Sequence, residues 1–197
     1  TIVPISILED AGLGTFSIVS AFDSAPSTAL DEVGQQTPLT WILGTPVQTG
    51  GNLAFDSITM LANGQLRFQT SLNTAGSATV TVQLSDSGLN TAPHSNQSLV
   101  QTITINVANV NDPPNANTEN YVIDAGENLL LNASLTTDPD VPFGDTLNYA
   151  WDLNGDGTFE TNAGTNSTTT LTWAQLVSAG VTAPAEYNAS LRVTDTA

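Results

Sequence analysis

Residues 79–84 read Thr-Val-Thr-Val-Gln-Leu, and residues 101–107 read Gln-Thr-Ile-Thr-Ile-Asn-Val. In both stretches an apolar residue occupies every second position, which is the pattern of a strand with one buried face. Between them and the N-terminus, the pair Asn63-Gly64 predicts a hairpin turn, because Asn and Gly tolerate positive φ. These features predict an all-β fold built from antiparallel sheets.

The same alternation recurs along the whole chain. Further strands are predicted at residues 1–7, 15–21, 39–43, 65–69, 119–123, 128–133, 147–152, 168–171 and 187–194, and the two quoted strands extend over 78–84 and 99–107. Residues 172–177, Thr-Trp-Ala-Gln-Leu-Val, predict one short helical turn.

The run Asn111-Asp112-Pro113-Pro114 marks a domain boundary, since proline cannot continue a central strand. We therefore expect two tandem antiparallel β-sandwiches, at residues 1–112 and 113–197. The late strands at 80–86 and 189–195 end alike, in Leu-Ser-Asp and Val-Thr-Asp, but a partner strand follows only the first. The sequence thus predicts that the second sandwich lacks its final strand, which the parent protein or another chain would supply.

The charge balance limits the partners. The chain has 19 acidic residues, no lysine, and only Arg67 and Arg192 as basic residues, for a net charge of -17. Such a chain cannot build a basic patch, which argues against nucleic acid and anionic membrane surfaces and favours metal cations. There is no cysteine, which excludes disulfides and thiolate metal sites and favours a bacterial exported protein. No apolar run approaches the roughly 18 residues of a membrane helix.

Residues 152–160 read Asp-Leu-Asn-Gly-Asp-Gly-Thr-Phe-Glu. Oxygen side chains at loop positions 1, 3 and 5 (Asp152, Asn154 and Asp156), followed by a glycine, match the start of an EF-hand-type calcium loop. The Thr158 carbonyl and the Glu160 carboxylate would complete the set. Ala163 stands where a full EF-hand has its bidentate Glu, so the alternative is a polar β-turn without an ion.

A second group of oxygen side chains flanks the domain boundary. Its members end predicted strands or lie in the linker: Glu9, Asn111, Asp112, Asp138, Asp140 and Asp195. Carboxylates gathered at a junction would repel one another unless a hard cation neutralised them. The sequence therefore predicts a hard cation at the junction between the domains.

Three runs carry a resemblance to a family. They are Ile-Leu-Glu-Asp-Ala-Gly at 7–12, Gly-Ser-Ala-Thr-Val-Thr-Val-Gln-Leu-Ser-Asp-Ser-Gly at 76–88, and Thr-Ile-Thr-Ile-Asn-Val-Ala-Asn-Val-Asn-Asp-Pro-Pro at 102–114. Residues 1–114 resemble a bacterial cadherin-like tandem repeat. The resemblance implies that the six boundary residues share calcium between adjacent domains. Thr-Ser-Leu-Asn at 70–73 replaces the family's acidic motif, which favours one ion over three.

The second half of the chain contains Tyr-Ala-Trp-Asp at 149–152, Gly-Asp-Gly at 155–157, and a predicted strand from Tyr187 to Asp195. On these runs, residues 115–197 resemble a polycystic-kidney-disease-type (PKD) sandwich domain. The two resemblances together imply tandem Ig-like or cadherin-like β-sandwiches. The resemblance implies an extracellular spacer or adhesion module without catalysis, and strand position predicts that Trp151 is a core residue.

The scarcity of residues and motifs typical of active sites argues against an enzyme. The single histidine, His94, lies in a polar loop, and no Gly-x-Ser-x-Gly elbow, phosphate loop or His-based zinc spacing occurs. We expect an extracellular structural or adhesive segment that binds calcium and neighbouring repeats. Two alternatives remain open. One is a carbohydrate-binding accessory region using Trp41, Trp173 and Tyr121 as a platform for surface glycans. The other is a filament or surface-layer subunit whose copies exchange strands.

Overall fold

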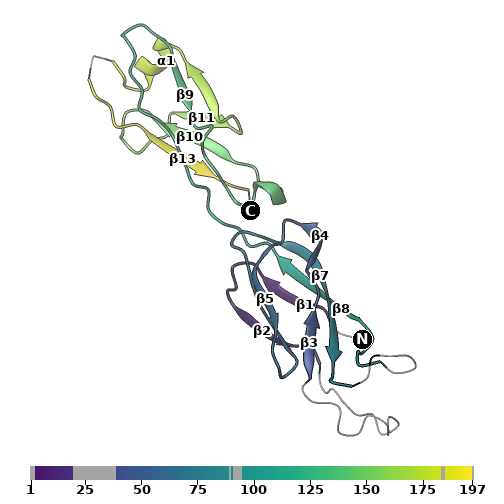
Figure 1. Cartoon of the computed structure of the whole chain (residues 1–197). Helices are drawn as coiled ribbons and strands as arrows, with labels where there is room; N and C mark the ends of the chain where they lie inside the picture. The colour runs from purple at the N-terminus through teal and green to yellow at the C-terminus, as the bar shows by residue number, and fades with distance from the viewer. Residues whose placement is uncertain (1–2, 20–38, 89, 91–94, 183–184, 197) are drawn as a thin grey trace. The chain divides into compact units, whose positions relative to one another are not determined.

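The computed structural model describes residues 3–19, 39–88, 90, 95–182 and 185–196. The chain divides into unit 1, Thr1–Val110, and unit 2, Asn111–Ala197. Strands dominate both units, and α1 is the one α-helix within the described residues, which confirms the all-β prediction (Figure 1). No helix in this part of the chain is long and apolar enough to span a bilayer. His94 lies outside the described residues.

Unit 1 contains eight strands in its described part. They are β1 (Ile5–Leu8), β2 (Gly14–Ser17), β3 (Thr40–Leu43), β4 (Val47–Gly51), β5 (Phe55–Met60), β6 (Gln65–Thr70), β7 (Gly76–Ser85) and β8 (Gln101–Ala108). One sheet has the order β1-β8-β7-β3, with β4 also paired to β7, and the other has the order β2-β6-β5. The finer assignment to Ig-like or cadherin-like sandwiches stays a prediction.

The strands predicted at residues 79–84 and 101–107 pair directly with each other. β7 and β8 are antiparallel, with Val80 opposite Ile103 and Ala78 opposite Ile105. The predicted turn at Asn63-Gly64 joins β5 to β6, and the N–H of Leu61 donates to the carbonyl of Gln65 at 2.8 Å. Gly64 has φ 81°, the left-handed conformation for which glycine is suited.

One ladder departs from the antiparallel expectation. β1 pairs with β8 in parallel, with Ile5 opposite Ile105. No hairpin joins β1 to β8, and the next strand in sequence, β2, belongs to the other sheet. Turn geometry therefore does not force β1 to run antiparallel, and its direction follows from the tertiary arrangement.

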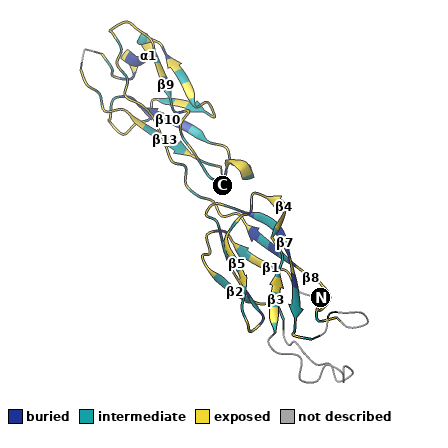
Figure 2. Cartoon of the chain, viewed as in Figure 1, coloured by how far each residue is buried: buried dark blue, intermediate teal, exposed yellow. Residues whose placement is uncertain are grey.

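Both sheets of unit 1 contribute to one hydrophobic core. Val80 and Ile103 come from the first sheet, and Leu66 and Phe68 from the second, and all four are almost fully buried (Figure 2). The ring of Phe68 stacks on that of Phe16, with centroids 4.8 Å apart. Because the inward residues are those at alternate positions, the periodicity of the sequence is the physical origin of this core.

Unit 2 contains two smaller sheets. Its elements are β9 (Leu129–Asn132), the 3-10 helix η2 (Val141–Phe143), β10 (Asn148–Asp152), β11 (Thr161–Gly164), β12 (Thr168–Leu171), α1 (Trp173–Ser178) and β13 (Ser190–Thr194). One sheet has the order β11-β10-β13, and β12 pairs with β9 in the other (Figure 1). The predicted helical turn is α1, which begins with a capping box formed by Thr172 and Gln175.

The core of unit 2 surrounds Trp151. This side chain is only 2% exposed and packs with Leu131, Leu176 and other apolar residues, which confirms the predicted core role. The ring of Tyr121 meets it edge-on, with centroids 6.2 Å apart. Truncation of such a buried aromatic side chain costs about 3–5 kcal/mol of stability, so Trp151 anchors the unit.

The predicted strand at 119–123 is wrong, because this segment forms no strand. The hydroxyl of Tyr121 accepts from the N–H of Asn132 at 2.8 Å and lies 3.0 Å from its carbonyl. The Tyr121 side chain thus hydrogen-bonds the backbone groups of Asn132, with which a strand at 119–123 would have paired. β4 was not predicted, because its five residues are all exposed and therefore show no apolar alternation.

Candidate metal centres

Two clusters of acidic side chains lie within unit 2. We call Asp138, Asp145 and Asp195 the acid trio, and residues 152–160 the Asp152 loop. In the trio, one carboxylate oxygen of each residue lies within 4.8 Å of the others, and Asp152, Asp156 and Glu160 meet the same condition in the loop. Both clusters could therefore hold a metal ion.

The acid trio is assembled from three separate segments. Asp138 follows the bridge between Asn115 and Thr137, and Asp195 directly follows β13. Between them in sequence, η2 turns the chain back, so that the N–H of Asp145 donates to the carbonyl of Asp140 at 3.3 Å. Asp145 was not predicted as a ligand, because only this turn reveals that it returns to the other two acids.

The trio has few hydrogen-bond donors. One oxygen of Asp138 accepts from the N–H of Asp140 at 2.7 Å, and Oδ2 of Asp195 accepts from Nδ2 of Asn111 at 3.4 Å. The Oδ2 atoms of Asp138 and Asp145 are buried and have no hydrogen-bond partner among the described residues. Buried carboxylate oxygens usually have such a partner, so these two atoms lack the compensation that proteins ordinarily provide.

Electrostatics around Asp145 disfavours the ionisation of this side chain. Desolvation raises the pKa of Asp145 above its ordinary value, and the negative charges of Asp140, Asp138 and Asp195 raise it further, in that order. Each of these causes acts against the charged form of the carboxyl group. A cation bound among the three side chains would be the strongest charge near Asp145. Because that charge is positive, it would favour the ionised carboxylate.

The Asp152 loop has the opposite hydrogen bonding. Asp152 is only 3% exposed, and its two oxygens accept from the N–H groups of Gly155 at 2.7 Å and Gly157 at 2.9 Å. Both glycines adopt positive φ, 80° and 89°, which lets their two backbone N–H groups turn toward one carboxylate. The tight curl predicted from the glycine positions is thus present.

The remaining side chains of the loop bind its backbone in the same way. Asn154 accepts from the N–H of Asp156 at 2.8 Å, and Asp156 accepts from the N–H of Thr158 at 2.7 Å. The pKa of Asp156 is lowered by hydrogen bonds from the backbone and side chain of Thr158, and then by the bond that Nδ2 of Asn154 donates to Oδ2 of Asp156 at 3.2 Å. Glu160 closes the loop by accepting from the N–H of Leu153 at 2.9 Å. The loop is therefore stabilised by backbone donors even without an ion.

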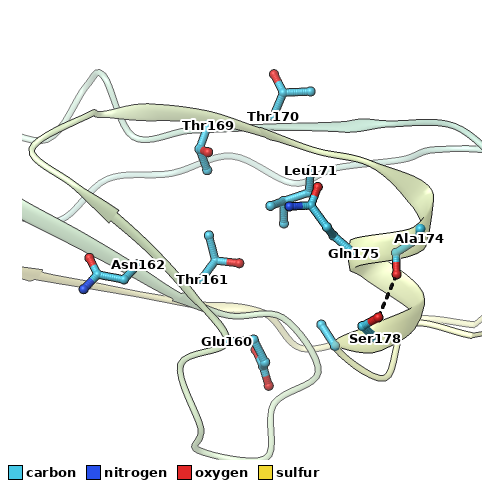
Figure 3. A pocket seen from close by; sticks show the side chains of 10 residues that line it. Glu160, Thr161, Asn162, Thr169, Thr170, Leu171, Ala174, Gln175 and Ser178 are labelled. Atoms are coloured by element: carbon cyan, nitrogen blue, oxygen red, sulfur yellow. Dashed lines mark hydrogen bonds between the residues drawn. The ribbon is translucent and has the colours of Figure 1, made fainter.

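An open groove of about 640 Å³ adjoins the Asp152 loop at Glu160. Figure 3 shows its lining, which comes from the start of β11, from β12 and from α1. The polar lining includes Thr161, Asn162 and Gln175, while Ser178 donates its hydroxyl to the carbonyl of Ala174 at 2.9 Å. Among the described residues that line the groove, none is aromatic and one, Glu160, is charged.

Two further carboxylates bind the backbone of the segment that joins the units. Within unit 1, Glu9 is 4% exposed and accepts from the N–H of Val110 at 2.5 Å. Within unit 2, Asp140 is 1% exposed and accepts from the N–H of Asp112 at 2.5 Å. Each unit thus fixes its own end of the linker with a buried acid.

The structure therefore brings together part of the predicted ligand set. Asp138 and Asp195 meet in the trio, and Asp152, Asp156 and Glu160 meet in the loop. Asn154 and Thr158 take part in the loop through the hydrogen bonds above. Calcium ligation by Glu9, Asn111, Asp112 and Asp140 at a shared junction stays a prediction.

The aromatic residues considered for a sugar platform are occupied in packing. Trp41 packs against the core of unit 1, and Trp173 and Tyr121 pack against the core of unit 2. All three are partly buried. Comparison of the chain with models of protein families, with curated proteins and with solved structures gives no match.

Proposed function

We propose that this chain is an extracellular structural or adhesive segment of a larger bacterial surface or secreted protein, and that calcium stabilises its second unit at the acid trio. The observation that carries the proposal is the pair of buried, unpartnered Oδ2 atoms of Asp138 and Asp145, gathered with Asp195. An ion there would supply the positive charge that the described donors do not.

The chemistry of the ligands favours calcium. The trio offers only carboxylate oxygens, which are hard ligands suited to Ca²⁺ or Mg²⁺ rather than to metals that prefer sulfur or imidazole. Ca²⁺ accepts irregular sets of 6–8 oxygens, whereas Mg²⁺ demands a near-ideal octahedron. Three carboxylates from three separate segments suit the more tolerant ion. The Asp152 loop is the second candidate for the same cation.

The mechanical role follows from which segments the ion would join. Asp138 precedes η2, Asp145 follows it, and Asp195 directly follows β13, so one ion would cross-link three parts of unit 2. Asn111, at the start of the unit, already donates to Asp195. A calcium-loaded trio would therefore also hold the first residue of the unit in place, and a stiff linker is what a spacer or adhesive repeat requires.

A calcium titration of the isotopically labelled 197-residue chain tests the proposal. We expect saturable changes in the amide resonances around Asp138, Asp145 and Asp195, and a higher melting temperature of unit 2. An ion at 100 times its dissociation constant stabilises the state that binds it by about 2.7 kcal/mol, which corresponds to a shift of roughly 10–20 °C for a unit of this size.

A matched pair of variants gives the control. Asp145→Asn removes one ligand of the trio, and Asp124→Asn makes the same charge change at an exposed acid of unit 2 outside both clusters. Calcium should stabilise the Asp124→Asn protein as much as the parent chain and the Asp145→Asn protein much less. Equal melting temperatures of the parent chain in calcium and in chelator would refute the proposed role of the ion.

A further inference from the structure

We infer that the solvent-facing side of the β11-β10-β13 sheet binds the carboxylate of an acidic sugar residue, a uronic acid, through Arg192. This goes beyond the proposed structural role and does not depend on calcium. The site is a shallow hollow of about 190 Å³ over the middle strand, lined by Asn148, Tyr149, Ala150, Asn162, Arg192 and Thr194.

The strand register explains why a hollow forms there. Ala150 on β10 lies opposite Asn162 on β11 and opposite Arg192 on β13, so the three residues form one row across the sheet. The central residue is the smallest of the row, and its neighbours are longer. Tyr149 and Trp151, which alternate with Ala150, belong to the core. The row therefore faces solvent, and the short side chain of Ala150 leaves a hollow between the longer polar side chains of Asn162 and Arg192.

The guanidinium of Arg192 is held in place without a carboxylate. It lies over the ring of Phe159, 4.0 Å from the centroid. No acid in the described part of the chain forms an ion pair with it, although the chain carries 19 acidic residues. A guanidinium over an aromatic face keeps its N–H groups available for a planar carboxylate, which it binds with two parallel hydrogen bonds.

One acid shares this face of the sheet with Arg192. Asp152 lies one row along β10, opposite Ser190, and its two oxygens already accept from Gly155 and Gly157. Among the described residues that line the hollow, Arg192 is a cation and none is acidic. The charge of the lining therefore favours an anionic ligand.

The polar residues around Arg192 favour a sugar over a peptide. The amides of Asn148 and Asn162 and the hydroxyl of Thr194 can each donate and accept, as sugar hydroxyl groups require. An extended acidic peptide instead adds to the edge of a sheet, whereas this hollow lies over the central strand. Its volume is below the roughly 300–1,000 Å³ of a typical ligand pocket, so it fits one unit of a longer chain.

The test is a titration of the full chain, in chelator, with the trimer of galacturonic acid. We expect saturable shifts of the amide resonances of Ala150, Asn162 and Arg192. Arg192→Gln should weaken binding by about tenfold or more, because it removes the charge-assisted hydrogen bonds. Arg67→Gln is the matched control. Arg67, the other cation of the chain, lies on the middle strand β6 between Thr15 and Thr59, and its loss should leave binding unchanged.

Further arms separate the possible ligands and guard against misfolding. The methyl ester of the trimer keeps the sugar ring but lacks the charge, and it should bind about tenfold more weakly or worse. Ala150→Leu fills the hollow at a half-exposed position and should also weaken binding, with the amide spectrum of the unit otherwise retained. Absence of saturable shifts, equal binding by Arg192→Gln, or equal binding of a triglutamate peptide would each overturn the inference. Because calcium is absent, none of these outcomes bears on the calcium proposal.

Discussion

The acid trio and the Asp152 loop have the same kind of side chains and opposite electrostatics. In the loop, backbone N–H groups surround the carboxylates, and the pKa of Asp156 is lowered. In the trio, two buried oxygens find no donor in the described part of the chain, and the pKa of Asp145 is raised. The loop is thus stable by itself, whereas the trio leaves a charge imbalance that an external cation would correct.

This contrast shows that a count of acidic residues does not identify a cation site. The loop matches a calcium motif in sequence, but its oxygens already accept hydrogen bonds from backbone N–H groups. An ion bound there must share these oxygens with the N–H groups or displace the hydrogen bonds. The trio matches no contiguous motif, but its oxygens have fewer partners to lose. We therefore expect the trio to dominate the response to calcium, and the following changes test that ranking.

The largest effect is expected from Asp152→Asn. The amide keeps the shape of the side chain but replaces one acceptor with a donor that faces the N–H of Gly155 or Gly157. In chelator, the free energy of unfolding of unit 2 should fall by about 2–3 kcal/mol, which chemical denaturation would measure. A loss below about 0.5 kcal/mol, similar to that of a surface substitution, would show that the loop does not depend on its backbone donors.

Asn154→Asp should make the loop more like the trio, with fewer hydrogen-bond donors and more negative charge. The side chain loses its N–H bonds to the carbonyl of Ala179 and to Oδ2 of Asp156, and it brings two negative charges together. We expect a loss of roughly 1 kcal/mol in chelator and a gain in calcium affinity, read by denaturation and by calorimetry. If calcium affinity does not increase, donor supply is not what separates the two clusters.

Asp145→Asn should act in the opposite direction from Asp152→Asn. Removing this charge relieves repulsion from Asp140, Asp138 and Asp195. At neutral pH and in chelator, the variant should melt a few degrees above the parent chain, while the same substitution removes most of the gain from calcium. A variant that melts lower in chelator would show that the carboxylate is already compensated.

The smallest effect is the pH dependence of that difference. A carboxyl group whose pKa is raised on folding destabilises the folded state above that pKa and has no such effect below its unfolded pKa of about 3.9. The advantage of Asp145→Asn should therefore shrink as the pH falls through the raised pKa toward 4. Asp156 has a lowered pKa, so its stabilising contribution is present at neutral pH and is lost only in more acidic solution. Melting temperatures of the parent chain and of the Asp145→Asn protein, measured side by side from pH 3.5 to 7, would check the direction of the pH dependence for both carboxyl groups.

Prediction of the fold succeeded where the signal was local. The alternation in residues 79–84 and 101–107 specifies β7 and β8, and Asn63-Gly64 specifies the turn between β5 and β6. It failed at residues 119–123, where the hydroxyl of Tyr121 bonds the backbone of Asn132, a contact between residues that are not adjacent in sequence. It also failed for the direction of β1, which no turn determines.

The candidate sites divide along the same line. The sequence by itself determined the all-β class and the Asp152 loop, because side-chain periodicity and a contiguous run of Asp, Asn and Gly act over a few neighbouring residues. Only the tertiary structure decided that Asp145 joins Asp138 and Asp195, and that Ala150 lies between Asn162 and Arg192. Those groupings depend on which strands pair and on where η2 turns the chain, and such long-range choices arise from packing of the whole unit.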